Sequence, residues 1–240
     1  SKFLEEKIKD HHLEKSYKSP KYDFNKSNFI ILRHIYAYTK IYLVIHIPSF
    51  QIFSMKLFDI SSDQKMVNHE KEFCNNHSHP YFTRFYGFVK ENNEIIRCIY
   101  QFMSNDNLEK FIEKNKETIN DFYSLTIVNR IIKGIEYLQS NSLVHRDLKP
   151  ANILIDHDFI GYISDFETIR TITKDNSFSF NFGTPQYESP EQYKGEKISF
   201  PTDIYSFGLI IYFIFEKKHM FVGKDIDRIS DILLNENEIP

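Results

Sequence analysis

The apolar residues of this 240-residue chain change their spacing partway along it, and this change constrains the fold more than any other feature. In segment 51–57 apolar and polar residues alternate, which is the pattern of a half-buried β-strand. In segments 108–117 and 121–139 the apolar residues recur at helical spacing instead. The sequence therefore predicts an α+β protein with two unequal lobes, the first rich in strands and the second rich in helices.

Further strand and helix signals fill the first part of the chain. Two apolar stretches, 82–89 and 95–102, lie on either side of the polar residues 91–93 and predict two strands joined by a turn. Segment 63–76 carries apolar residues at helical spacing, so a helix is expected there. The charged residues 1–20 predict a short helix or a loose arm.

Charge and cysteine content exclude several classes of protein. The chain has 30 Lys and Arg against 33 Asp and Glu, and this near-neutral balance argues against a dedicated nucleic-acid-binding protein. No apolar run is long enough for a membrane helix, and the first residues lack the apolar core of a signal peptide, so we expect no membrane insertion. Only Cys74 and Cys98 are present, which is typical of a reducing, cytoplasmic location.

Chemistry is concentrated in segment 145–152, which reads His-Arg-Asp-Leu-Lys-Pro-Ala-Asn. Asp147 is followed by Lys149 and by the amide of Asn152, and a second carboxylate, Asp165, comes after a short apolar hairpin expected at 153–163. Carboxylate and amide oxygens are suited to Mg²⁺ that holds phosphates. The remaining carboxylate can accept a hydroxyl proton, and the lysine can offset the charge of a transferring phosphoryl group.

This segment resembles the catalytic loop of eukaryotic protein kinases, H-R-D-L-x-x-x-N followed by D-F-G. The Lys-Pro pair after Leu148 is similar to the Ser/Thr-specific version, and Tyr-Ser-Phe-Gly at 205–208 is similar to the tyrosine-kinase-like group. The resemblance implies a bilobal fold and transfer of the ATP γ-phosphoryl group to Ser or Thr of a protein substrate. It makes Asp147 the catalytic acceptor of the hydroxyl proton, with Asn152 and Asp165 as the magnesium ligands.

The same resemblance assigns a nucleotide site. Met55-Lys56 resembles the V-A-I-K element, so Lys56 is expected to hold the ATP phosphates and to pair with Glu70 on the next helix. Tyr100 is expected to guard the back of the adenine pocket. The other expected nucleotide contacts are Ile41, Ser54, Gln101, Met103 and Leu154.

The resemblance also sets the boundaries of the chain's parts. They are an N-terminal arm at 1–28, the first lobe at 29–100, a hinge at 101–106 and the second lobe at 107–240. Since the family normally continues with further helices, the second lobe is expected to be incomplete, with no evident partner for Glu191. The oligomeric state is not predicted.

The region after Asp165 carries further family features. Asp203 is expected to tie down the catalytic loop from the start of a large buried helix. Arg146 is expected to pair with a phosphate on the activation segment. The candidate phosphorylated residues are Thr168, Thr171, Thr173, Ser177 and Ser179.

Two departures from the family pattern leave a second hypothesis open. The three glycines expected in the nucleotide-covering loop are replaced by His34, Tyr36 and Thr39, and the D-F-G glycine is replaced by Glu167. Glycines let the backbone approach the phosphates closely, so their loss argues against tight ATP binding. The alternative is therefore a pseudokinase that acts as a scaffold or allosteric regulator.

Overall fold

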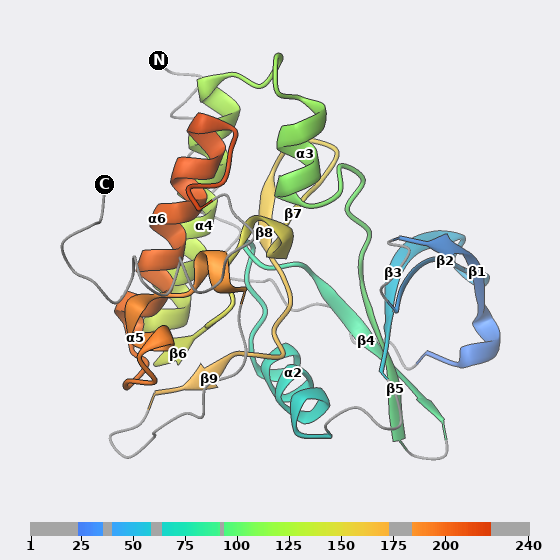
Figure 1. Cartoon of the computed structure of the whole chain (residues 1–240). Helices are drawn as coiled ribbons and strands as arrows, with labels where there is room; N and C mark the ends of the chain where they lie inside the picture. Colours follow the sequence, from blue (N-terminus) through green and yellow to red (C-terminus); the bar gives the residue numbers. More distant parts are fainter. Residues whose placement is uncertain (1–23, 36–39, 59–63, 92–93, 173–183, 222–240) are drawn as a thin grey trace. The chain divides into compact units, whose positions relative to one another are not determined.

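The chain separates into two structural units in the computed structural model, Ser1–Phe102 and Met103–Pro240 (Figure 1). The structure describes residues 24–35, 40–58, 64–91, 94–172 and 184–221. The boundary between the units falls inside the segment 101–106 that the sequence assigns to a hinge.

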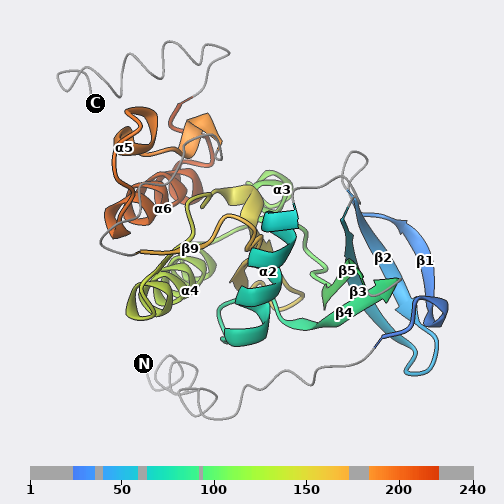
Figure 2. The same cartoon turned by 90° about the horizontal axis from the view of Figure 1, so that it is seen from below.

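An antiparallel five-stranded sheet, in the order β1-β2-β3-β5-β4, forms most of the first unit (Figure 2). Its strands are β1 (Phe29–His34), β2 (Ile41–His46), β3 (Gln51–Leu57), β4 (Phe85–Glu91) and β5 (Glu94–Gln101), and a 3-10 turn, η2 (Lys26–Asn28), precedes β1. The predicted strand 51–57 is confirmed. The strand expected from residue 82 begins later, at Phe85.

Alternation along β3 produces the core of this unit. Phe53 and Met55 are buried on one face of the sheet, with Val44 and Ile99 opposite them in the neighbouring strands. Lys56 therefore points to the other face, since successive side chains of a strand alternate. The register places it opposite Ile41 on β2 and Cys98 on β5.

The one helix described in the first unit, α2 (Gln64–Asn76), buries a stripe at helical spacing. Val67, Glu70, Phe73 and Cys74 are all buried, as positions three and four apart should be on one face. Glu70 is the charged member of this apolar stripe. A buried carboxylate requires hydrogen-bonding or charged partners, so Glu70 marks a functional position on α2.

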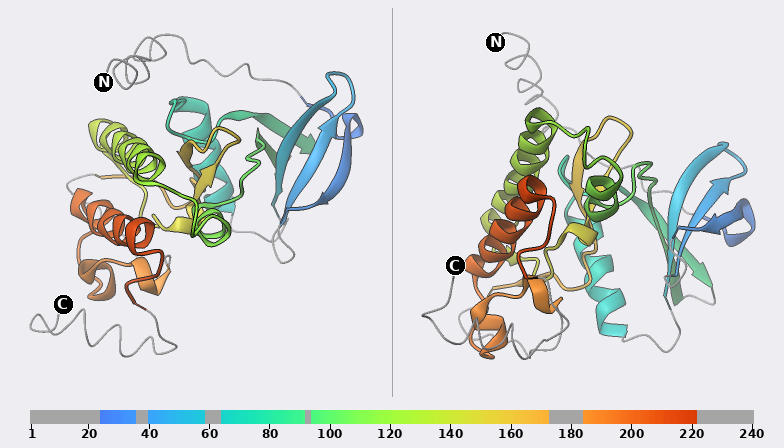
Figure 3. Two further views of the ribbon diagram at one scale, coloured as in Figure 1. Left: turned by 90° about the horizontal axis from the view of Figure 1, so that it is seen from above. Right: turned by 45° about the horizontal axis from the view of Figure 1, so that its top comes forward.

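Helices dominate the second unit. They are α3 (Leu108–Lys114), α4 (Asp121–Ser140), α5 (Pro190–Tyr193) and α6 (Phe200–Glu216). Asn107 and Asn120 begin α3 and α4 by accepting N-terminal backbone N–H groups. The helix expected over 108–117 ends at Lys114, because the side chain of Asn115 donates to the Phe111 carbonyl. Figure 3 shows α4 and α6 side by side in both views.

Two small antiparallel sheets complete the second unit. One is a true hairpin of β7 (Ile153–Ile155) and β8 (Gly161–Ile163). The other is a two-stranded antiparallel sheet that pairs β6 (Leu143–Val144) with the later strand β9 (Arg170–Thr171). Short 3-10 turns, η3 (Pro150–Asn152) and η4 (Pro185–Tyr187), lie beside them in the sequence. The predicted apolar hairpin at 153–163 is confirmed. None of the described helices is both long and apolar enough to cross a membrane.

Candidate active site

The first unit contains a buried ion pair at the predicted position. The ammonium Nζ of Lys56 lies 2.9 Å from Oε2 of Glu70, and the Glu70 side chain is only 1% exposed. Lys56 is 17% exposed, so the charged end of β3 retains limited access to solvent. A buried pair of this kind needs its remaining oxygen satisfied as well, because an unpaired buried acceptor is costly.

Tyr100 supplies that second bond. Its hydroxyl donates to Oε1 of Glu70, and Sγ of Cys74 lies 3.4 Å from the same hydroxyl. Burial raises the pKa of Tyr100 well above its ordinary value, so the hydroxyl keeps the proton that it donates. Glu70 therefore connects α2 to β3 through Lys56 and to β5 through Tyr100. The sequence gives no local signal for this bond, since 30 residues separate its partners.

In the second unit, one oxygen of Asp147 is held by two side chains. Oδ2 accepts from Nζ of Lys149 at 2.8 Å and from Nδ2 of Asn152 at 3.0 Å. Nδ2 of Asn152 also donates to the Asp147 carbonyl, at 2.8 Å. Oδ1 of Asp147 is buried and has no hydrogen-bond partner among the described residues. The carboxylate is thus fixed in orientation while one oxygen stays available as an acceptor.

Lys149 makes a further contact that the sequence did not predict. Its ammonium donates to Oγ1 of Thr184 at 2.7 Å. Thr184 belongs to the Gly-Thr-Pro segment at 183–185, which resembles the end of a kinase activation segment. In the sequence, this contact is indicated by nothing more than the presence of a hydroxyl residue, Thr184. Lys149 consequently links Asp147 to the segment that begins at Thr184.

A buried carboxylate on α6 holds the backbone of the catalytic loop. Asp203 accepts from the backbone N–H of His145 at 2.8 Å and of Arg146 at 2.9 Å. Burial raises the pKa of Asp203, and His145, together with these two N–H groups, partly offsets the rise. Arg146 has a φ of 72°, a conformation that a side chain with a Cβ rarely adopts. The predicted tie is confirmed, and it holds the loop in this strained form.

The two predicted magnesium ligands lie at adjacent ends of the β7–β8 hairpin. Ser164, just before Asp165, donates from its N–H to the Asn152 carbonyl at 2.9 Å. Because Nδ2 of Asn152 is used on Asp147, its Oδ1 is the atom left for a cation, and it accepts no hydrogen bond within the described residues. An amide oxygen and the Asp165 carboxylate form a hard oxygen set that fits Mg²⁺.

Glu167 replaces a glycine without backbone strain. The residue of this element with positive φ is Asp165, at 63°, and Glu167 is not among the residues with positive φ. Aspartate visits this region more readily than most residues. The carbonyl of Glu167 accepts from Arg170 at 2.8 Å. Position 167 therefore does not require a glycine in this conformation.

Comparison with known proteins decides the family. Residues 37–239 match the family model of the protein kinase domain. This chain belongs to the protein kinase family. The predicted family and the predicted α+β, bilobal fold class are both confirmed.

Individual relatives are serine/threonine kinases or other protein kinases. The chain is 32% identical over 143 residues to a probable LIM domain-containing serine/threonine-protein kinase of Dictyostelium discoideum. It is 34% identical over 155 residues to 3-phosphoinositide-dependent protein kinase 1 of Rattus norvegicus, and 27% identical over 196 residues to a carbon catabolite-derepressing protein kinase of Candida glabrata. The matches cover 60%, 61% and 79% of this chain but only 22%, 26% and 32% of the respective relatives.

The remaining predicted nucleotide contacts of the kinase domain fall in both units. Ile41 pairs with Lys56, and Ser54 lies between Leu43 and Tyr100 in the sheet. Gln101 ends β5 and donates its N–H to the Arg84 carbonyl at 2.8 Å. In the second unit Met103 is buried, and Leu154 lies on β7 opposite Tyr162.

The structure also bears on the candidate phosphorylated residues and on Glu191. Thr168 is buried and donates its hydroxyl to the His145 carbonyl at 2.7 Å, which argues against it as the phosphorylated residue. Glu191, for which the sequence offers no evident partner, accepts a hydrogen bond from Oγ1 of Thr202 at 2.6 Å. The predicted positions at Tyr36, Thr39, Thr173, Ser177 and Ser179 lie outside the described residues.

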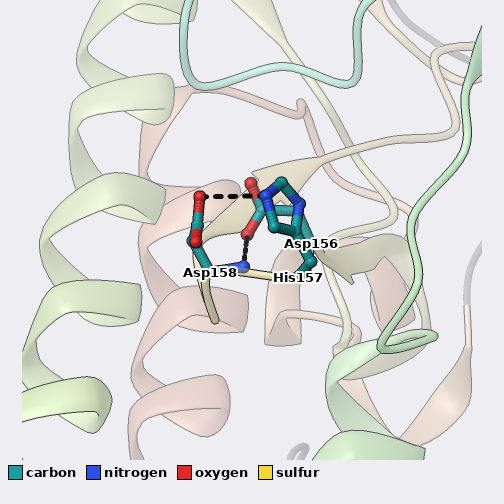
Figure 4. A group of neighbouring side chains, drawn as sticks. All are labelled: Asp156, His157 and Asp158. Atoms are coloured by element: carbon teal, nitrogen blue, oxygen red, sulfur yellow. Dashed lines mark hydrogen bonds and ion pairs between the residues drawn. The ribbon is translucent and has the colours of Figure 1, made fainter.

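A carboxylate-rich group at Asp156, His157 and Asp158 has a structural explanation (Figure 4). Oδ1 of Asp156 accepts from the backbone N–H of Asp158 and of Ile160, each at 2.9 Å. Its Oδ2 accepts from the Tyr162 hydroxyl at 3.0 Å. Both oxygens of Asp156 are thus used to close the turn between β7 and β8, and this group supports no metal site.

Replacing Asp203 by Ala tests the tie between α6 and the catalytic loop. The change leaves two buried N–H groups without an acceptor, so the free energy of unfolding should fall by about 3 kcal/mol. Chemical denaturation measures it, with Asp158→Ala in the exposed turn as the control, expected to change stability by less than about 0.5 kcal/mol. Equal losses in the two variants would contradict the assignment.

Replacing Tyr100 by Phe tests the second anchor of Glu70. The buried carboxylate loses one donor, so the free energy of unfolding should fall by about 1–3 kcal/mol. Hydrogen exchange of α2 should become faster, because the hydrogen bond between Glu70 and Tyr100 on β5 is gone. Tyr42→Phe is the matched control, since no hydrogen bond of the Tyr42 hydroxyl is found within the described residues. Unchanged exchange in α2 would show that Tyr100 does not anchor it.

Proposed function

We propose that this kinase domain transfers the γ-phosphoryl group of ATP to Ser or Thr hydroxyls of a protein substrate. The observation that carries the proposal is the buried, unpartnered Oδ1 of Asp147 beside a fully engaged Oδ2. A substrate hydroxyl hydrogen-bonded to Oδ1 is oriented for attack, and its proton passes to the carboxylate during transfer. Lys149 offsets charge on the transferring group through its ammonium.

In this proposal each unit supplies its own set of nucleotide contacts. Lys56, positioned by Glu70, binds the α- and β-phosphates, while Asn152 and Asp165 hold Mg²⁺. The bound ion neutralises phosphate charge, which is the contribution expected of magnesium in phosphoryl transfer. The other proposed nucleotide contacts are Ile41, Ser54, Gln101, Met103 and Leu154. The rate then depends mainly on positioning and electrostatics.

Preference for Ser or Thr is supported by the Lys149–Thr184 contact and by relatives that are named as serine/threonine-protein kinases. Because the chain spans 15–32% of the length of its first relatives, the substrates of any longer protein are part of this proposal. A cytoplasmic location is also proposed. Both cysteines are buried and free, which fits a reducing compartment.

The second candidate is a pseudokinase that acts as a scaffold or an allosteric regulator. The side chains at His34, Tyr36 and Thr39 favour it, because they replace the glycines that let backbone approach phosphate. The ring of His34 lies 4.2 Å from that of Tyr42, so its side chain packs on β2. The hydrogen bonds of Asp147 and Asn152 favour transfer instead, since a scaffold has no need of an oriented carboxylate with a free oxygen.

Replacing Asp147 by Asn separates the two candidates. The amide keeps the shape of the carboxylate and loses the proton acceptor, so phosphate incorporation into a Ser peptide should fall by roughly 10²–10⁴-fold. The thermal shift produced by Mg-ATP should persist, because Asp147 is not assigned to nucleotide binding. Asp158→Asn removes an exposed charge from the same unit and is the control, with unchanged transfer.

Two results would contradict the enzyme proposal. Binding of Mg-ATP with no Asp147-dependent transfer would favour the scaffold. A missing thermal shift with Mg-ATP would exclude both the enzyme and a nucleotide-gated regulator.

A further inference from the structure

Two contacts clamp segment 184–192 against the catalytic loop. At its start, Oγ1 of Thr184 accepts from Lys149 at 2.7 Å. At its end, Nε2 of Gln192 donates to the Arg146 carbonyl at 3.0 Å. The backbone N–H of Ser189 donates to Oε1 of Gln192, also at 3.0 Å, so the middle of the segment is tied to the same side chain. The residues between these contacts are held beside Asp147.

Glu188 lies between these two contacts. It is partly buried, and no hydrogen bond or ion pair of its side chain is found within the described residues. The nearby hydroxyl of Tyr193 is used, since it donates to the Pro185 carbonyl at 3.0 Å. The ammonium of Lys149 is engaged with Asp147 and Thr184.

The electrostatics of Glu188 are unfavourable in the absence of a substrate. Burial raises the pKa of its carboxyl, and the negative charge of Asp147 raises it further. A partly buried carboxylate next to a like charge contributes nothing to the stability of the domain. A neutral side chain of the same size would be tolerated equally well or better, so a role inside the fold does not account for this acid.

We propose that Glu188 is a specificity-determining residue that binds a Lys or Arg flanking the Ser or Thr acceptor of the substrate. This inference rests on the proposed function. With the acceptor hydroxyl on Asp147, a flanking cation meets two carboxylates and supplies the partner that Glu188 lacks. A charge-assisted hydrogen bond in a partly desolvated site is among the stronger polar contacts. A flanking acid in the peptide is repelled by the same two groups.

A peptide series with Mg-ATP tests this inference. Each peptide carries one Ser. The residue directly before the Ser and the residue directly after it are varied one at a time to Lys, Ala or Glu. For the unaltered domain, kcat/KM for the best Lys peptide should exceed that of the Ala peptide by about tenfold. Glu188→Gln should remove this preference, and Glu188→Lys should transfer it to the Glu peptide. Glu196→Gln, an exposed site with the same charge change, is the matched control and should keep the preference.

Two further measurements make the outcome independent of catalysis and of folding. Binding of fluorescent Lys and Ala peptides should show the same Glu188-dependent difference by anisotropy, even in Asp147→Asn. The unfolding free energy of Glu188→Gln should equal or exceed that of the unaltered domain. A marked loss of stability would reveal an internal partner and overturn the inference.

The possible failures are distinguishable. Lack of transfer to every peptide, together with Glu188-dependent binding, would contradict the proposed function and leave the binding role of Glu188 standing. Transfer with no preference for Lys, or with a preference that survives Glu188→Gln, would overturn the inference and leave the kinase activity intact.

Discussion

The catalytic loop depends on one buried carboxylate. Asp203 reaches from α6 and accepts from two consecutive N–H groups, those of His145 and Arg146. These bonds hold Arg146 at a positive φ, and Asp147 follows directly in the chain. Without them the loop would relax toward an ordinary conformation, and the orientation of the Asp147 carboxylate would change with it. The geometry of Asp147 thus depends on Asp203, which holds the backbone before it, as well as on Lys149 and Asn152, which hold its carboxylate.

Glu70 has a corresponding role in the first unit. It too is a buried carboxylate with both oxygens engaged, in this case by Lys56 and Tyr100. In each unit, a carboxylate buried away from solvent is stabilised by hydrogen-bond donors that come from other elements of the fold. The same requirement makes Glu188 notable, because it is a partly buried acid for which no donor is found within the described residues. The fully hydrogen-bonded carboxylates of Glu70 and Asp203 stabilise the fold. The carboxylate of Glu188 has no such partners within the described residues, and we assign it to substrate binding.

Much of the fold followed from spacing alone. Alternation located β3, and helical periodicity located α4 with nearly the observed ends. Boundaries were less predictable where a side chain decides them, as Asn115 does for the end of α3. The candidate catalytic residues were predictable because they lie close together in one segment that resembles the family pattern. Lys56 and Glu70 were predictable because Met55-Lys56 resembles a second family element, whose lysine pairs with a Glu on the next helix.

The rest of the site depends on contacts between distant residues. Tyr100 bonds to a residue 30 positions away, and Lys149 to one 35 positions away. Nothing in the local pattern around either residue encodes its partner. The family pattern places a glycine at position 167, whereas the positive φ of this element falls on Asp165. Contacts and conformations of this kind become visible only in the folded chain.

The central claim is that Asp203 promotes transfer by orienting Asp147. Single-turnover rates with saturating Mg-ATP and Ser peptide test it most directly, in Asp147→Asn, Asp203→Asn and the double variant. If Asp203 acts through Asp147, the double variant should be no slower than Asp147→Asn alone, because residues that act as a unit are not additive. Rate losses that multiply in the double variant would contradict this account.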